Sequence, residues 1–214
     1  MQMDLFEPGE REEEALGPGA VVLRGFALSV EEPLLAALDE VIERAPLRHM
    51  TTPGGFRMSV AMTNCGALGW VSDERGYRYD PIDPERAAPW PAMPEAFARL
   101  ATRAAEQAGH PGFEPDACLV NRYAIGARLT LHQDKNERDF RQPIVSVSLG
   151  LPARFLFGGE RRSDPQARVR LVHGDVAVWG GPARLRYHGV LPLEEGEHPR
   201  LGPFRFNLTF RKAG

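Results

Sequence analysis

The stretch "FRFNLTFR", residues 204–211, alternates strictly between apolar and polar side chains. Because side chains alternate across a strand, the pattern predicts a β-strand with one face against an apolar core. The other face carries two arginines separated by an amide and a hydroxyl. It is either a solvated face, which is normal for an antiparallel sheet, or the wall of a binding site. Its residues are Arg205, Asn207, Thr209 and Arg211.

Seven similar short runs precede this one, broken from one another by Gly and Pro. They are CLVNRY, ARLTLH, PIVSVSLG, ARFLFG, ARVRLVH, DVAVWGG and ARLRYHGV, between residues 118 and 190. Eight strands at this spacing predict an antiparallel sandwich or barrel, and a double-sheet jelly roll is one form that encloses a site. The turns HGD at 173–175 and FGG at 157–159 suit the ends of hairpins.

Two amphipathic helices are predicted ahead of these strands. The first covers SVEEPLLAALDEVIERA, residues 29–45, where Ser29 and Glu32 have the spacing of a capping box. The second covers PEAFARLATRAAEQAG, residues 94–109, and Gly109 is expected to end it. The fold class expected is therefore α+β and mostly β, a jelly-roll core with N-terminal helices.

Composition limits the classes of function. A chain of 214 residues fits one large domain, or a domain with an added lobe. No run of about 18 apolar residues exists, so no membrane span is expected. Cys65 and Cys118 are the only cysteines, too few for a secreted disulfide framework, and a cytoplasmic location is expected. The net charge of −3 argues against a dominant electrostatic grip on nucleic acid, but 24 Arg against 2 Lys leave a local arginine patch open.

The sequence "LTLHQDKN", residues 129–136, places His132 and Asp134 two apart at the end of an alternating run. If the strand stays extended, both side chains project to the same side and offer a metal ion a nitrogen and an oxygen. His188, in LRYHGV, is the candidate third ligand. Two histidines and one carboxylate with open positions are the ligand set of non-haem Fe(II) oxygenases. The alternative is a surface turn with a structural histidine.

The polar face of residues 204–211 complements such a metal centre. Guanidinium pairs with carboxylate through two charge-assisted bonds, so the arginines suit a small dicarboxylate. Asn121 and Tyr123 add two polar groups on one face of LVNRY. A 2-oxoacid that chelates the metal at one end and meets arginine at the other would supply the two electrons that O₂ activation needs.

Several longer motifs resemble the bacterial AlkB family of Fe(II)/2-oxoglutarate-dependent dioxygenases, which repair alkylated nucleic-acid bases. The resemblance runs from about residue 20 to the end of the chain. The motifs are TPGGFRMSVAMTNCGALGW, PIDPERAAPWPAMP, NRYAIGARLTLHQDK, PIVSVSLGLPA, HGDVAVWGG, YHGV and RFNLTFR.

The resemblance implies a role for each matching residue. It implies that iron is held by His132, Asp134 and His188, and that 2-oxoglutarate lies among Asn121, Tyr123, Arg205, Asn207, Thr209 and Arg211. In the family a lid before the barrel recognises the nucleotide. By that match Trp70 stacks on a flipped base opposite His132, Tyr77 touches a backbone phosphate, Met58 and Met62 line the pocket, and Arg162 lies beside the substrate.

The acidic composition of the first residues predicts a tail, and the resemblance implies a division of the rest of the chain. We expect an acidic flexible tail over 1–19, a strand and helix that support the barrel over 20–45, a nucleotide-recognition lid over 46–93, and a second support helix with the catalytic core over 94–214. The segment 46–93 is rich in Pro, Gly, Met and aromatics with little period, which is typical of a functional segment or a stack of short hairpins.

The implied activity is oxidative dealkylation of 1-methyladenine, 3-methylcytosine and etheno adducts. The substrate would be single- or double-stranded DNA, with RNA possible, and Fe(II), O₂ and 2-oxoglutarate would be consumed or bound, with release of formaldehyde, succinate and CO₂. A monomer without an obligate protein partner is expected. The alternatives are a dioxygenase of the same fold that acts on protein or a small molecule, and a non-catalytic jelly-roll binding module.

One position departs from the family pattern. After the iron-binding aspartate the family typically has Lys-Asp-Glu, whereas this chain has Lys135, Asn136 and Glu137. A carboxylate at the middle position can pair with the positive charge of 1-methyladenine or 3-methylcytosine. Asn136 keeps an oxygen acceptor without the charge, and we expect it to weaken the preference for cationic lesions.

Overall fold

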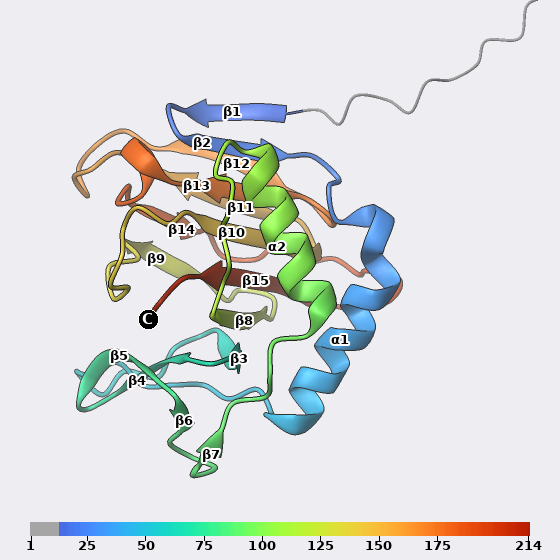
Figure 1. The fold of residues 1–214 in the computed structure, drawn as a ribbon, viewed down its shortest axis with the longest axis vertical. Helices are drawn as coiled ribbons and strands as arrows, with labels where there is room; N and C mark the ends of the chain where they lie inside the picture. The colour runs from blue at the N-terminus through green and yellow to red at the C-terminus, as the bar shows by residue number, and fades with distance from the viewer. Residues whose placement is uncertain (1–12) are drawn as a thin grey trace, which may run out of the picture.

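The structure, a computed structural model, describes residues 13–214. Within that range two antiparallel sheets pack face to face (Figure 1). The large sheet has the order β1-β2-β13-β10-β15-β8-β3 and the small sheet the order β12-β11-β14-β9. The core between them joins Ile144 and Trp179 of the large sheet to Phe155 of the small one. This double-sheet jelly roll confirms the predicted fold class.

The strands of the large sheet are β1 (Glu13–Gly17), β2 (Ala20–Leu23), β13 (Val176–Trp179), β10 (Ile144–Gly150), β15 (Arg205–Arg211), β8 (Ala117–Tyr123) and β3 (Ala61–Gly66). The strands of the small sheet are β12 (Ala167–Leu171), β11 (Ala153–Phe157), β14 (His188–Val190) and β9 (Leu129–His132). Strands β8 to β15 correspond to the eight predicted runs, although β9 and β14 are shorter than their patterns. The run ARLRYHGV, residues 183–190, is shortened to β14 because a 3₁₀ helix, η2 (Gly181–Ala183), and the turn after it occupy its start.

Helices α1 (Glu31–Arg44) and α2 (Glu95–Gln107) cover the outer face of the large sheet (Figure 1). Phe97 of α2 meets Phe210 of β15 edge to face, with ring centres 5.8 Å apart. Gly109 ends α2 as predicted: its φ is +83°, and the amides of Gly109 and His110 donate back to the last turn in a Schellman pattern. No helix in the described part of the chain is long and apolar enough to span a membrane.

The capping box predicted at the start of the first helix is wrong. The N-cap residue of α1 is Val30, which makes no side-chain cap bond. Ser29 lies inside a preceding 3₁₀ helix, η1 (Leu28–Val30). Because this 3₁₀ turn precedes α1, the α-helix begins after Val30 and Ser29 is not its N-cap residue.

The prediction that HGD, residues 173–175, forms a hairpin turn is also wrong. The segment joins β12 to β13, which belong to different sheets, so residues 173–175 form a crossover between the two layers. Asp175 holds it through bonds from the amides of Gly25 and Val172, both 2.9 Å long. FGG does begin a hairpin, since β11 and β12 pair antiparallel across a long connection.

The N-terminal part of the chain differs from the predicted flexible tail. Residues 13–17 form β1, which pairs with β2 at the edge of the large sheet. The rest of the predicted tail, residues 1–12, lies outside the described residues. The alternation of β1 is weak because most of its side chains are exposed.

The segment 46–93 contains one strand of the large sheet and two small hairpins. Strand β3 pairs with β8. The hairpins are β4 (Gly69–Asp73) with β5 (Gly76–Asp80), and β6 (Ile82–Asp83) with β7 (Ala88–Pro89). They lie together beyond β3, at the far end from β1 (Figure 1). A stack of short hairpins was one of the two interpretations of this segment.

Strand β15 is buried on both faces. Its apolar face packs against the helices on the outer side of the large sheet. Its polar face points into the space between the sheets. Arg205 is 1% exposed and Arg211 is 6% exposed. The solvated-face interpretation is therefore excluded, and the fold has placed two guanidinium groups inside the barrel.

Candidate active site

The ligand atoms of His132, Asp134 and His188 lie within 4.8 Å of one another. Strand pairing brings the histidines together, because His132 of β9 is directly opposite His188 of β14. Asp134 follows β9 by two residues, and its two oxygens each lie 3.7 Å from one histidine Nε2. Two imidazole nitrogens and a carboxylate oxygen at this spacing fit an open Fe(II) site.

Both histidines are oriented for metal binding by the same backbone contact. Nδ1 of His132 lies 2.9 Å from the carbonyl oxygen of Thr130, and Nδ1 of His188 lies 3.0 Å from that of Arg186. A proton on Nδ1 leaves Nε2 with its lone pair toward the cluster. Burial, with His132 close by, lowers the pKa of His188 from 6.5 to about 4, so its ring is neutral at pH 7.

Arg211 holds the carboxylate ligand. Its Nε and Nη2 donate to Oδ2 of Asp134 at 3.1 and 2.8 Å. Burial alone would raise the pKa of Asp134, but Arg211 and the two histidines lower it below its ordinary value. The carboxylate is therefore ionised, and since both bonds from Arg211 go to Oδ2, Oδ1 is available to a metal ion.

Arg205 is a buried cation that lacks an anion. Its Nη2 donates to Oγ of Ser148 at 3.0 Å, but Nε and Nη1 have no hydrogen-bond partner among residues 13–214. The buried hydroxyl of Tyr123 is also unpartnered there, and its ring centre lies 4.9 Å from the Arg205 guanidinium carbon. Burial lowers the pKa of Arg205. A carboxylate would satisfy these donors, so the pocket fits one end of 2-oxoglutarate.

The remaining polar residues of the pocket form a connected network. Asn121 Nδ2 and Thr209 Oγ1 both donate to Oδ1 of Asn207, at 3.3 and 2.9 Å. Asn207 in turn donates to Ser146 Oγ at 2.8 Å. All lie between the sheets, and the network joins β8, β15 and β10. Such a network fixes the positions of these polar side chains between the sheets.

The residues expected to contact a base do not all lie in one place. Trp70 of β4 stacks on Tyr77 of β5 with ring centres 5.6 Å apart, and its Nε1 donates to Oδ1 of Asn136 at 3.1 Å. Met62 is part of the core between the sheets, and Met58 and Trp70 pack against that core. Arg162 is exposed on the β11–β12 connection, with its guanidinium carbon 5.6 Å from the Tyr187 ring centre. Tyr187 directly precedes His188 in the chain.

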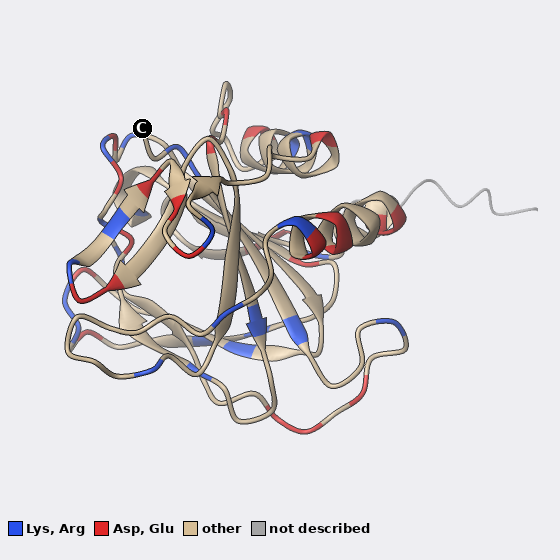
Figure 2. Ribbon diagram, turned by 90° about the horizontal axis from the view of Figure 1, so that it is seen from below, with Lys and Arg blue, Asp and Glu red and all other residues tan. Residues whose placement is uncertain are grey.

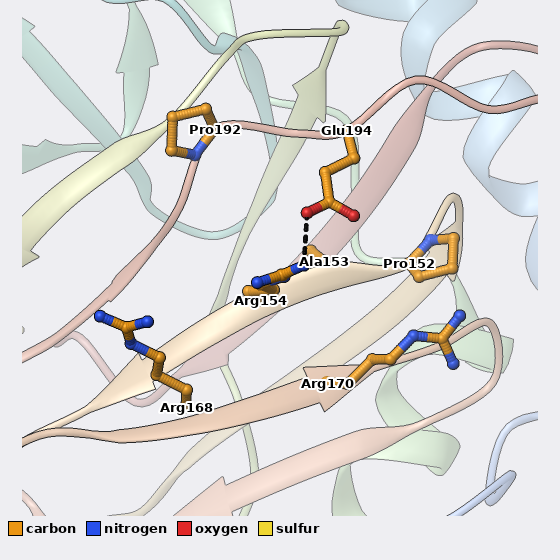
Figure 3. Close-up of a pocket in the computed structure, with 7 residues that line it drawn as sticks. All are labelled: Pro152, Ala153, Arg154, Arg168, Arg170, Pro192 and Glu194. Atoms are coloured by element: carbon orange, nitrogen blue, oxygen red, sulfur yellow. Dashed lines mark ion pairs between the residues drawn. The ribbon is translucent and has the colours of Figure 1, made fainter.

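A separate concavity of about 280 Å³ lies on the outer face of the small sheet (Figure 3). Arg168 and Arg170 line it from β12, and Arg154 of β11 pairs there with Glu194 at 2.7 Å. These strands turn Phe155 and Val169 inward, so the arginines face away from the metal cluster. The concavity is not part of the candidate active site.

Several residues that shape the site were not identified from the sequence. Ser146 and Ser148 could have been found, because they alternate with valines in PIVSVSLG and so share one face. Glu137 matches the last residue of the family's Lys-Asp-Glu pattern, but Tyr79 and Arg184 carry no comparable local signal. The three residues lie far apart in the chain and meet only in the folded structure.

A jelly roll that encloses a His-Asp-His cluster and, among the described residues, a buried arginine without an anionic partner defines a class of protein, the Fe(II)/2-oxoglutarate-dependent oxygenases. Comparisons with known proteins agree. Residues 19–211 match the family model of the 2OG-Fe(II) oxygenase superfamily. The chain is 58% identical over 212 residues to the alpha-ketoglutarate-dependent dioxygenase AlkB of Escherichia coli (strain K12), covering 99% of this chain and 98% of that protein. It therefore belongs to this superfamily and, within it, to the bacterial AlkB family.

Other relatives extend the likeness. An AlkB homolog of Caulobacter vibrioides is 46% identical over 198 residues, 92% of this chain and 88% of that one. The solved structure of OsALKBH1 superposes with a TM-score of 0.80 at 30% identity, over 94% of this chain and all of that one. A 2OG-Fe(II) oxygenase from Burkholderia pseudomallei shares the fold, with a TM-score of 0.55 at 17% identity. The protein is an enzyme, a dioxygenase that uses Fe(II), O₂ and 2-oxoglutarate.

Proposed function

We propose that the protein removes alkyl groups from the base-pairing nitrogens of nucleic-acid bases. His132, Asp134 and His188 would bind Fe(II), and Arg205 would anchor the distal carboxylate of 2-oxoglutarate. The observations that carry the proposal are the His-Asp-His cluster and a buried arginine on the inward face of β15 whose Nε and Nη1 have no partner among the described residues. Relatives named AlkB, and an Arabidopsis thaliana relative named as a DNA N(6)-methyladenine demethylase, support nucleic acid as the substrate.

The chain's own residues bind, orient and enclose the reactants. When bound, iron and 2-oxoglutarate supply the oxidation: O₂ is consumed, 2-oxoglutarate becomes succinate and CO₂, and a hydroxylated N-methyl group leaves as formaldehyde. Asn121, Asn207 and Thr209 line the cosubstrate pocket. Trp70 offers an aromatic face on which a flipped base can stack without sequence selection, worth about 1–3 kcal/mol per base. Met58 and Met62 give that pocket a flexible apolar wall.

The segment 46–93 is the proposed nucleotide-recognition lid. Its hairpins lie at the end of the barrel, and its residues Trp70 and Tyr77 form a stacked pair with Tyr77 47% exposed. An exposed tyrosine hydroxyl can donate to a backbone phosphate. We extend the proposal to a monomer that acts in the cytoplasm, on DNA and on RNA.

The decisive experiment is formaldehyde release from oligonucleotides that contain 1-methyladenine or 3-methylcytosine, with and without Fe(II) and 2-oxoglutarate. Release that requires both supports the proposal. A methylated peptide in the same assay is the comparison, because turnover of the peptide alone would favour a protein-modifying dioxygenase. Binding of the oligonucleotide without turnover under any of these conditions would favour a binding module.

Binding to nucleic acid is expected to be modest and salt-sensitive. Acidic and basic residues both occur on the helices, strands and loops (Figure 2), and a chain of net charge −3 can still offer a local arginine contact to phosphate. Arg162→Ala should weaken oligonucleotide binding and reduce its salt dependence, as measured by fluorescence anisotropy across a salt series. Arg168→Ala, in the concavity on the outer face, is the control. Affinity that stays constant from low to high salt would contradict the prediction.

Asn136→Asp is expected to favour cationic lesions. The side-chain oxygen of Asn136 accepts a bond from Trp70, and aspartate preserves an acceptor there while adding a charge next to the proposed base site. Bonds to ionised groups are about twice as strong as neutral ones. We expect kcat/KM on 1-methyladenine and 3-methylcytosine to improve a few-fold more than on ethenoadenine, or ~1 kcal/mol. Equal changes on both lesion types would show that this position does not sense the charge of the base.

A further inference from the structure

The β4–β5 hairpin is fastened to the loop that carries the metal-binding aspartate. Trp70 Nε1 donates to Asn136 Oδ1 at 3.1 Å, and the hydroxyl of Tyr79 donates to Glu137 Oε1 at 2.6 Å. Trp70 and Tyr79 are directly opposite each other in the hairpin. A single cross-strand pair therefore connects the proposed lid to two consecutive residues just after Asp134.

Glu137 is a buried carboxylate with two arginine partners. It is 6% exposed. Its Oε2 accepts from Arg184 Nη2 at 2.9 Å, and its Oε1 lies 3.5 Å from Arg211 Nε. A buried charge is costly unless it is paired and hydrogen-bonded, and here the third partner is the hydroxyl of Tyr79. Burial raises the pKa of Tyr79 well above its ordinary value, so this hydroxyl remains a donor.

The same two arginines hold Asp134. Arg211 donates two bonds to its Oδ2, and Arg184 Nη1 donates to its backbone carbonyl at 2.7 Å. Arg184 also donates from Nε to the carbonyl of Gln142 at 2.9 Å, which closes the loop onto η2. Glu137 therefore lies between the hairpin on one side and the position of the carboxylate ligand on the other.

We propose that Tyr79 and Glu137 form a latch that couples seating of the β4–β5 hairpin to the metal centre, with Glu137 as a positioning residue. When the hairpin is seated, the Tyr79 hydroxyl satisfies Oε1 of Glu137, and Arg211 stays on Asp134. When the hairpin lifts, Oε1 loses its donor and competes with Asp134 for Arg211, which lies only 3.5 Å away. Asp134 then loses its fixed orientation, and metal affinity falls. By linkage, bound metal favours the seated hairpin to the same extent.

Tyr79→Phe tests the latch because it keeps the ring and removes only the hydroxyl. A residue that merely packs would tolerate this change. Loss of the Tyr79 hydroxyl instead frees Glu137 to draw Arg211 from Asp134, and loss of an outer contact of a metal ligand, here the one from Arg211, typically weakens metal affinity by about 10- to 100-fold. We expect Mn(II) affinity of the full-length protein, measured by calorimetric titration, to fall about 10-fold in the variant. Tyr77→Phe removes an exposed hydroxyl from the same strand and is the matched control for metal affinity.

The second readout is hydrogen–deuterium exchange of residues 69–80 with and without Mn(II) and 2-oxoglutarate. In the unmodified protein these additions should slow exchange in the hairpin, and in Tyr79→Phe the slowing should be lost. An unchanged Mn(II) affinity, or hairpin protection that still responds to metal in the variant, overturns the latch. The inference rests on the proposed ligand role of Asp134 but not on the substrate. A protein that shows the coupling yet fails to demethylate any oligonucleotide would refute the proposed function alone.

Discussion

Replacing His132, Asp134 or His188 with Ala is expected to abolish formaldehyde release while the fold stays largely intact. Each residue is one of the three proposed ligands, and removal of one would spoil both the affinity and the geometry of an open iron site. The measurements are formaldehyde release, iron content and circular dichroism. Unchanged activity in any one variant, with iron still bound stoichiometrically, would refute the ligand assignment.

The three variants should differ in stability, which provides an internal control. The side chain of His132 is 32% exposed, so its loss removes little buried area. Asp134 is buried and neutralises Arg211, and breaking a buried pair costs about 3–5 kcal/mol when the other charge has no compensation. Since Glu137 also lies near Arg211, we expect the cost for Asp134→Ala to be lower than that range but greater than for His132→Ala. Equal denaturation midpoints for the two variants would contradict this order.

The features that the sequence did predict depend on local periodicity. The alternation in residues 204–211 specifies a strand whatever surrounds it, and the two-residue spacing of His132 and Asp134 puts both side chains on one side of an extended chain. His188, at the end of the run LRYHGV, was the candidate third ligand, the family motifs matched it, and the structure places it opposite His132 in the small sheet. Each inference needed only short stretches of chain.

The features that failed depend on which sheet a strand joins. A turn such as HGD at 173–175 looks the same whether the next strand pairs with the last one or crosses to the other layer. Alternation also cannot show whether the polar face of β15 meets water or the interior, because that depends on the small sheet packing against it. The capping box predicted at Ser29 failed for another reason. The spacing of Ser29 and Glu32 does not show that a 3₁₀ turn precedes α1.

The network around Glu137 could not be predicted because its members come from four distant parts of the chain. Tyr79, Glu137, Arg184 and Arg211 meet only after the β4–β5 hairpin, the chain that follows β9, η2 and β15 have assembled. Nothing in the polar residues next to Glu137 in the sequence indicates that its carboxylate is buried. Its burial is a tertiary property, set by the arginines that surround it.

Arg205→Ala is expected to raise the KM for 2-oxoglutarate far more than any other substitution on the polar face of β15. Among the described residues, Nε and Nη1 of Arg205 are buried without a partner, whereas Nε and Nη2 of Arg211 already donate to Asp134. A hydrogen bond to a charged group is worth about 1.5–3 kcal/mol, and each 1.4 kcal/mol is tenfold, so KM should rise about 10- to 100-fold. Initial rates against 2-oxoglutarate concentration measure the effect. Arg122→Ala is the matched control, because Arg122 lies on the neighbouring strand, where its guanidinium packs over Phe204.

Arg211→Ala should give a different result, and the contrast identifies the orientation of the cosubstrate. Arg211 lies at the metal end of the pocket, against Oδ2 of Asp134, so its loss should weaken metal binding as well as raise the KM for 2-oxoglutarate. Arg205→Ala should leave Mn(II) affinity in the absence of cosubstrate near that of the unmodified protein. If both substitutions weaken metal equally, Arg205 also acts on the metal centre and does not mark the distal end. If neither alters cosubstrate dependence, the polar face of β15 is not the 2-oxoglutarate pocket, because these are the cations that this face offers to a dicarboxylate within the described residues.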